Sequence, residues 1–217
     1  EILGCKFMPC NRYREVVPIK GTDVRKKLLN NFEYILPQFQ YYFRKTVTVF
    51  GSESCGKTTM TKRLSKDMNG WFIPEWAREY LETVGKEITD EKMENIFYGQ
   101  LSSQLAAEET LLNKPWIFQD TDLLSTVGYH KIFGTEPSKD LLEWSNEMLS
   151  DIYIVMNDGI PFEQDPLRYG GDVRESGTQM WIDILEKHHC KYIVVPLGTH
   201  DEQTEWIKTE LLRYFEE

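Results

Sequence analysis

Short apolar runs alternate along this chain with longer segments in which apolar residues recur every three or four positions. The runs are rich in β-branched and aromatic residues and predict strands at residues 46–50, 70–73, 115–120, 151–157 and 190–198. The periodic segments predict helices at residues 57–68, 76–84, 89–114, 123–134, 137–149, 178–189 and 204–217. Strands that alternate with helices are typical of a three-layer α/β fold with a parallel sheet, here of five strands.

Residues 1–44 do not follow this alternation. They hold a basic stretch, a helix expected within residues 17–31, an extended stretch expected around Pro37, and a cluster of aromatic residues in 32–43. We therefore predict a boundary near Arg44 or Lys45, which divides the chain into residues 1–44 and residues 45–217.

The loop after the first predicted strand carries a strong chemical signal. Residues 46–60, TVTVFGSESCGKTTM, contain the P-loop pattern G-x-x-x-x-G-K-[ST], whose glycines let backbone amides wrap around an anion. The amino terminus of the following helix adds its positive dipole end. The pattern predicts that Lys57 reaches the β- and γ-phosphates of ATP and that Thr58 ligates Mg²⁺. The whole predicted phosphate site is Gly51, Ser52, Glu53, Ser54, Cys55, Gly56, Lys57, Thr58 and Thr59.

Composition narrows the partners of such a site. The 217 residues are 41% hydrophobic and 28% charged, as in an ordinary globular protein. A formal net charge of −10 provides no broad basic surface, so we expect neither nucleic acid nor a membrane as a partner. The four cysteines are too scattered for a disulfide framework or a structural metal site. We therefore expect a reducing, cytoplasmic location and small-molecule substrates.

Ligands of doubly wound folds bind where the strands end, so residues just after strands are candidates for chemistry. Glu75 follows the second predicted strand, and Arg78 lies in the first turn of the next helix. Glu75 could take the proton of a substrate hydroxyl, and Arg78 could hold the substrate. Interaction with the helix dipole explains an acid at position 75 equally well. Trp76 could stack on a planar substrate, although core packing is the better single interpretation.

Two aspartates follow the third predicted strand, where P-loop enzymes keep the acid that holds Mg²⁺ or its waters. These are Asp120 and Asp122 in the motif QDTD. We predict a catalytic role for one or both of them, and the preferred assignment places Asp120 at the metal and Asp122 at the substrate. Which acid is the metal residue, and whether the base is Glu75 or one of these two, stays open.

Residues 158–175 form a long polar connection rich in glycine and proline, too long to be a simple link. Arg168 and Arg174 lie within it and are predicted catalytic residues of a lid that closes over the phosphates. A single surface arginine is usually only solvated, but two in one loop favour a function. Residues 196–200, PLGTH, end the last predicted strand and could face an adenine ring.

Four motifs spread over residues 45–217 resemble the ribosylnicotinamide kinase domain of NadR-type bifunctional proteins of NAD biosynthesis: VFGSESCGKTT, PEWAREYLE, DTD and DGIPFEQDPLRYGGDVR. The second and fourth are more specific than the P-loop. The resemblance implies a P-loop kinase fold and transfer of a phosphoryl group from ATP, with Mg²⁺, to the 5′-hydroxyl of nicotinamide riboside, which gives nicotinamide mononucleotide. The residues alone indicate only a small-molecule kinase.

The resemblance also bears on residues 1–44. In these proteins a nucleotidyltransferase domain precedes the kinase and ends in an I-S-x-T-x-x-R motif. PIKGTDVR is similar, with Thr22 and Arg25 matching and Lys20 departing, whereas the H-x-G-H motif of such transferases does not occur in the sequence. Residues 1–44 thus look like the end of an adenylyltransferase domain. An adenylyltransferase domain, linked covalently or not, is therefore an expected partner. We do not expect this chain to make NAD by itself.

Two other functions stay open. The chain could be a kinase for another nucleoside or for a nucleotide, although a monophosphate acceptor should need more arginines than Arg78. It could also be a module that senses ATP or NAD without turnover. The set of carboxylates and lid arginines favours turnover over sensing.

Overall fold

The computed structural model describes residue 15 and residues 17–110, 113–157 and 177–216. Short helical segments come first: α1 (Gly21–Lys26), η1 (Phe32–Tyr34), α2 (Pro37–Gln40) and η2 (Tyr41–Phe43). The strands are β1 (Lys45–Phe50), β2 (Gly70–Ile73), β3 (Trp116–Asp120), β4 (Ile152–Val155) and β5 (Tyr192–Val194). The longer helices are α3 (Lys57–Asp67), α4 (Trp76–Val84), α5 (Asp90–Glu109), α6 (Leu123–Phe133), α7 (Lys139–Glu147), α8 (Gly177–Lys187) and α9 (His200–Glu216).

The strands pair in parallel in the order β2-β3-β1-β4-β5, which confirms the predicted five-stranded parallel sheet. β1 is central, with Val49 opposite both Asp120 of β3 and Ile154 of β4. The carboxyl ends of these strands therefore share one edge of the sheet, and we call it the carboxyl edge. The opposite edge, where the strands begin, is the amino edge.

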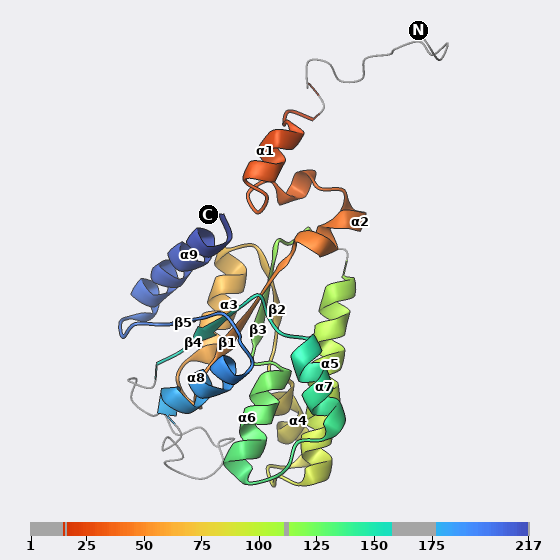
Figure 1. Cartoon of the computed structure of the whole chain (residues 1–217), viewed down its shortest axis with the longest axis vertical. Helices are drawn as coiled ribbons and strands as arrows, with labels where there is room; N and C mark the ends of the chain where they lie inside the picture. The colour runs from red at the N-terminus through yellow and green to blue at the C-terminus, as the bar shows by residue number, and fades with distance from the viewer. Residues whose placement is uncertain (1–14, 16, 111–112, 158–176, 217) are drawn as a thin grey trace, which may run out of the picture.

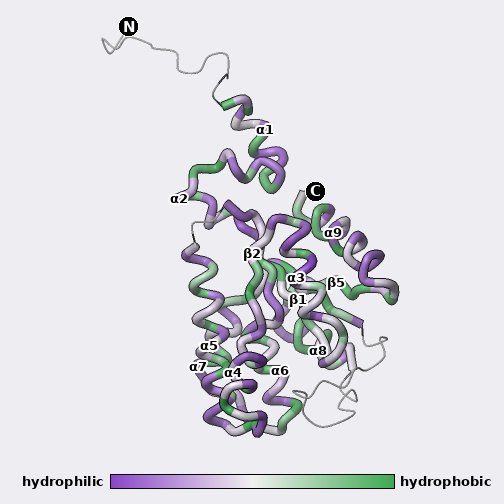
Figure 2. The backbone as a smooth tube through the Cα atoms, turned by 180° about the vertical axis from the view of Figure 1, so that it is seen from behind, coloured by the Kyte–Doolittle hydropathy of each residue, from purple (hydrophilic) through white to green (hydrophobic). Residues whose placement is uncertain are grey.

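Helices cover both faces of the sheet and make the three layers (Figure 1). On one face, Val47 and Val49 of β1 pack against apolar residues of α3 and α9. On the other face, Phe50 packs against Leu124 of α6 and Trp181 of α8. The alternation of a strand explains this division, since successive side chains point to opposite faces. Figure 2 shows hydrophobic segments gathered along the strands at the centre.

Capping residues explain where several helices begin. Thr89 caps α5 by accepting from the backbone N–H of Lys92 at 3.3 Å, and Ser138 caps α7 by accepting from that of Leu141 at 3.2 Å. Pro37 begins α2, so the extended backbone predicted around it is limited to the residues just before it, such as Ile35. In the described part of the chain, no helix has both the length and the apolar character needed to cross a bilayer.

The segment of residues 17–44 lies at the amino edge. Leu29 joins the core between β1, α3 and α9, and Gln40 donates from Nε2 to Asn113 Oδ1 at 3.1 Å. Arg44 donates to the carbonyl oxygen of Ala107 at 3.2 Å, near the end of α5. Figure 1 shows α1 and α2 at the far side of the sheet from α4 and α6. The domain boundary near Arg44 stays a prediction.

Candidate active site at the carboxyl edge

The loop between β1 and α3 has the backbone of a phosphate-binding loop. Gly51 and Gly56 have φ angles of +137° and +87°, and Ser54 lies in the left-handed region at 63°. A Cβ on Gly51 would lie 3.0 Å from the carbonyl oxygen of Met156, just beyond β4. Both the torsion and the close approach therefore require glycine at position 51. The loop leads directly into α3, whose first amides and positive dipole end are available to an anion.

Lys57, the first residue of α3, is the central cation of the loop. Its side chain is buried, and Nζ donates to the carbonyl oxygens of Gly51 at 3.0 Å and Ser52 at 2.7 Å. Burial alone would lower its pKa, but the surrounding acidic groups, which include Glu75 and Asp120, raise the pKa of Lys57 above the ordinary value. Lys57 therefore keeps its full positive charge at neutral pH.

Thr58 and Asp120 meet where the phosphate loop adjoins β3. Asp120 is buried, and the Thr58 side chain forms a hydrogen bond with its carboxylate. Burial raises the pKa of Asp120 against the opposing effects of this hydrogen bond and of Lys57. Asp120 Oδ1 has no hydrogen-bond partner among the described residues. A hydroxyl and an orphaned carboxylate oxygen fit Mg²⁺, which takes few protein ligands and fills its shell with waters and phosphates.

Thr121 separates the two aspartates and directs them apart. It has a positive φ of 67°, uncommon for a β-branched residue. Asp122 then caps α6: its Oδ1 accepts from the Ser125 backbone N–H at 3.0 Å, and its Oδ2 accepts from the Tyr153 hydroxyl at 2.7 Å. Asp122 is buried, and like Asp120 it is not among the residues that line the cavity described below. This placement speaks against the predicted catalytic and substrate roles of Asp122, because the helix terminus uses its carboxylate.

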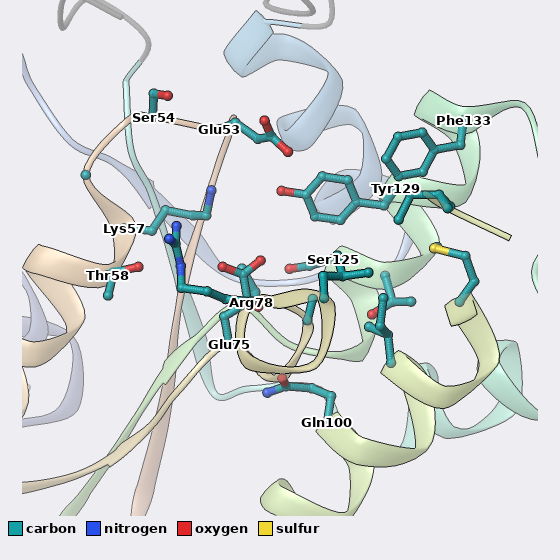
Figure 3. A pocket seen from close by; sticks show the side chains of 18 of the residues that line it. Glu53, Ser54, Lys57, Thr58, Glu75, Arg78, Gln100, Ser125, Tyr129 and Phe133 are labelled. Atoms are coloured by element: carbon teal, nitrogen blue, oxygen red, sulfur yellow. The ribbon is translucent and has the colours of Figure 1, made fainter. Parts of the chain in front are cut away.

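Glu75 and Arg78 lie at the start of α4 and face the same site (Figure 3). Glu75 is the N-cap of α4, yet its side chain makes no capping hydrogen bond. The start of the helix therefore does not use this carboxylate as a hydrogen-bond acceptor. Burial raises the pKa of Glu75, and Asp120 raises it further, while Lys57 opposes them. A carboxylate with a raised pKa beside a fixed cation is suited to accept a proton.

These side chains open into a cavity of about 410 Å³ (Figure 3). The phosphate loop, Glu75 and Arg78 form its polar end. The other end lies between α4, α5 and α6 and is mostly apolar, lined by Leu81, Ile88, Met93, Ile96, Tyr129 and Phe133. Small-molecule pockets span roughly 300–1,000 Å³, so this volume suits a nucleoside-sized ligand. The cavity thus joins a phosphate site to an apolar pocket.

The far wall of this cavity was missed by sequence reasoning. Ser125, Tyr129 and Phe133 line it from α6, spaced four residues apart and so on one helix face. Figure 3 shows the Tyr129 hydroxyl directed toward the Lys57 side of the cavity, and burial raises the pKa of Tyr129. The sequence did hold one signal for this wall, because the helix that became α6 follows the DTD motif directly. A helix that starts at the carboxyl edge places its first turns beside the site.

The remaining predicted residues lie in different places. Glu53, Ser54 and the exposed Thr59 line the cavity, while the Cys55 thiol is buried beneath the loop and donates to the Ser52 carbonyl at 2.9 Å. Arg168 and Arg174, with the whole predicted lid, lie outside the described residues.

Trp76 and the PLGTH segment have definite surroundings. Trp76 is absent from the cavity lining and contacts α5, where a Cβ added to Gly99 would lie 1.9 Å from its Nε1. Its side chain is nevertheless exposed, so the preferred interpretation as a core residue is wrong. Its substrate role stays a prediction. His200 ends PLGTH and begins α9, and its Nε2 lies 3.6 Å from where a Cβ on Gly56 would be. PLGTH therefore borders the phosphate loop, and its contact with adenine stays a prediction.

Known proteins similar to this chain confirm the resemblance to NadR-type proteins. The trifunctional NAD biosynthesis/regulator protein NadR of Escherichia coli (strain K12) is 23% identical over 207 residues, which are 94% of this chain and 50% of that protein. The protein of the same name from Salmonella typhimurium (strain LT2) is 23% identical over 209 residues, 93% of this chain and 50% of that protein. The chain spans about half the length of the curated relatives it matches.

Solved structures confirm the fold. A NadR protein in complex with NR superposes with a TM-score of 0.68 at 21% identity, covering 93% of this chain and 59% of that one. A deoxyadenosine kinase from M. mycoides superposes with a TM-score of 0.58 at 17% identity, covering 77% of this chain and 99% of that one. The fold is therefore the predicted P-loop kinase fold. The AAA domain family AAA_28 matches residues 46–203, and this chain belongs to it.

Proposed function

We propose that the chain transfers the γ-phosphoryl group of ATP to the 5′-hydroxyl of nicotinamide riboside, giving nicotinamide mononucleotide and ADP. The observation that carries this proposal is the position of Glu75. Its carboxylate is not used by its own helix, lies within the electrostatic reach of Lys57, and faces a cavity whose far end is apolar. A phosphate site, a base and a pocket for a planar ring are the parts that a nucleoside kinase needs.

The chemistry follows from the arrangement of these groups. Lys57 and the loop amides hold the β- and γ-phosphates, and Arg78 adds positive charge beside the transferring group. Mg²⁺, when held by Thr58 and Asp120, would neutralise charge on the phosphates. Glu75 takes the proton of the 5′-hydroxyl while the new oxygen–phosphorus bond forms and the bond to the β–γ bridging oxygen breaks. Most of the catalysis is positioning and electrostatic stabilisation.

The acceptor follows from the resemblance together with the cavity. The NadR structure named above is in complex with NR, which we take as nicotinamide riboside. A second NadR structure is in complex with NAD and AMP-PNP. Nicotinamide riboside carries a flat cationic ring, and the apolar end of the cavity offers the aromatic side chains of Tyr129 and Phe133. We further propose that Arg168 and Arg174 close over the phosphates and that an adenylyltransferase uses the product.

The test is direct. Purified protein is incubated with ATP, Mg²⁺ and a panel of nucleosides that includes nicotinamide riboside and deoxyadenosine, and both ADP and phosphorylated nucleoside are measured. Selective formation of nicotinamide mononucleotide is the expected result. Selective transfer to another nucleoside would replace the proposed acceptor, and binding of ATP without transfer to any nucleoside would overturn kinase function in favour of sensing.

A further inference from the structure

Gln100 is a polar residue in the wall of the cavity whose side chain is not fully used by the fold. It lies on α5, is 3% exposed, and contributes to the cavity lining. Its Nε2 is buried and has no hydrogen-bond partner in the described part of the chain. Buried amide groups are almost always hydrogen-bonded in native proteins, so an unpartnered donor at a cavity wall indicates a missing acceptor.

The orientation of this amide is fixed by α4. The backbone N–H of Trp76, the first residue of α4, donates to Gln100 Oε1 at 2.9 Å. Because a backbone N–H can only donate, the atom that faces it must be the oxygen. The same bond supplies a partner for one of the free amides at the start of α4, where the N-cap Glu75 makes no capping bond. Nε2 is therefore left as the group available to a ligand.

The position of Gln100 lies between the two ends of the cavity. Gln100 is hydrogen-bonded to Trp76, the neighbour of the proposed base Glu75. Earlier on α5 lie Ile96 and Met93, which line the apolar end of the cavity. These residues share one face of α5, since they are four and seven positions apart. A nucleoside with its 5′-hydroxyl at Glu75 and its base in the apolar end has its ribose and the near edge of its base beside Gln100.

We propose that Gln100 binds the acceptor nucleoside by donating a hydrogen bond from Nε2 to a neutral oxygen of the ribose or of the base, and that this bond contributes to selectivity. The inference rests on the proposed nucleoside kinase function. A purely structural role, capping α4, would use only Oε1. The two roles are separable, because one atom of the amide serves the helix and the other serves the ligand.

Gln100→Glu separates them, because the carboxylate keeps an acceptor for the Trp76 N–H and removes the donor. We expect the KM for the nucleoside to rise about 10–100-fold, while the KM for ATP stays within about twofold. Gln104→Glu is the matched control, because Gln104 lies one turn along α5 and is also 3% exposed but does not line the cavity. Its Oε1, too, has no hydrogen-bond partner among the residues that the structure describes. Equal nucleoside KM values for wild type and Gln100→Glu would overturn the proposal, as would equal effects of the two substitutions.

Substrate analogues keep the test decisive if a buried carboxylate impairs folding. Wild-type protein is assayed with nicotinamide riboside lacking, in turn, the 2′-hydroxyl, the 3′-hydroxyl and the carboxamide. One analogue should lose about 10–100-fold in kcat/KM and should be used equally well, within about twofold, by wild type and Gln100→Met. If wild type and Gln100→Met differ in kcat/KM equally with every analogue, Gln100 makes no such bond. Absence of transfer to any nucleoside would instead refute the kinase function on which the inference rests.

Discussion

Certain polar side chains at the two edges of the sheet differ in the hydrogen-bond partners that the fold gives them. At the carboxyl edge, Asp120 Oδ1 and Gln100 Nε2 are buried without a partner among the described residues. At the amino edge, Gln40 Nε2 donates to three oxygens. Arg44 there donates to the backbone carbonyls at the end of α5, those of Ala107, Glu108 and Thr110. These atoms of Asp120 and Gln100 stay available to a ligand, whereas the side chains of Gln40 and Arg44 fix the chain.

Large apolar side chains line the cavity at the carboxyl edge, whereas a group of them is exposed at the amino edge, with Tyr42 at 72% and Leu36 at 63%. Leu197, in the PLGTH segment at the carboxyl edge, is an exception at 64%. The comparison teaches that polar groups at the carboxyl edge are held ready at some cost in stability, since desolvated and unpaired groups destabilise a fold. Substitutions at this edge should therefore change activity most, and substitutions of polar groups at the amino edge should change stability most.

Lys57→Met should have the largest effect on activity. It should also lower stability, and so depart from the expectation that substitutions at the carboxyl edge change mainly activity. We expect phosphoryl transfer to fall by about 10³-fold or more, because the main cation at the phosphates is lost. Stability should fall as well. The folded-state pKa of Lys57 is raised, so its charge contributes stability that is fully present at pH 7, below its unfolded pKa. Steady-state kinetics and urea unfolding measure the two effects. If the variant retains activity, Lys57 is not the phosphate-binding cation of the site.

Glu75→Gln should lower activity without lowering stability, as expected for a polar group of the carboxyl edge. Loss of the proposed base should lower kcat by about 10²–10⁴-fold. The folded-state pKa of Glu75 lies above its unfolded value, so its charged form destabilises the fold at pH values above that pKa. The uncharged amide should therefore leave stability at pH 7 unchanged or higher. Retained turnover with this variant would show that another group takes the proton.

The pH dependence of the wild type tests the same carboxylate. Glu75 must be ionised to accept a proton, so kcat/KM should fall as the pH is lowered through its pKa. Because burial raises that pKa, the acid limb should lie above the ordinary glutamate value of about 4.3. The rate is measured between pH 4 and pH 8 for wild type and for Glu75→Gln. The residual rate of the variant should lack this limb, and an unchanged limb would assign it to a different acid.

The aspartates of the DTD motif should behave differently despite their spacing. Asp120→Asn should lower kcat by about 10²-fold, since the orphaned oxygen proposed for Mg²⁺ is changed, and higher Mg²⁺ should restore part of the rate. Asp122→Asn should lower kcat less than about threefold, because asparagine also caps helices well. Kinetics at several Mg²⁺ concentrations compare the two variants. Equal losses would contradict the separation of metal site and helix cap.

Sequence reasoning predicted the parts that depend on local chemistry. The phosphate loop follows from the torsions that Gly51 and Gly56 must adopt, and the strands follow from runs of apolar residues. The different surroundings of Asp120 and Asp122 could not be predicted, because they depend on the positive φ of Thr121 and on a hydroxyl from Tyr153. Both are set by tertiary packing, which no local pattern records.

The far wall of the cavity and the boundaries of some elements show the same limit. Tyr129 looks like an ordinary core residue on its helix, and only the position of α6 against α4 and α5 makes it part of a site. The last helix begins at His200 and not at the predicted Thr204, and α5 ends at Glu109 although helix was predicted to residue 114. Helix ends depend on capping and tertiary contacts as much as on periodicity.

Arg44→Ala should have the smallest effect on catalysis and tests the amino edge. Its guanidinium donates to the backbone carbonyls at the end of α5, so removing it leaves partly buried acceptors without their donor. We expect the free energy of unfolding to fall by about 1–3 kcal/mol, with kcat and both KM values within about twofold of wild type. Urea unfolding and steady-state kinetics measure these quantities. Lys26→Ala is the control, because Lys26 is exposed on α1 and should change stability by less than about 0.5 kcal/mol. A loss of activity in Arg44→Ala that exceeds its loss of stability would mean that the amino edge influences the site across the sheet, and the division between the two edges would fail.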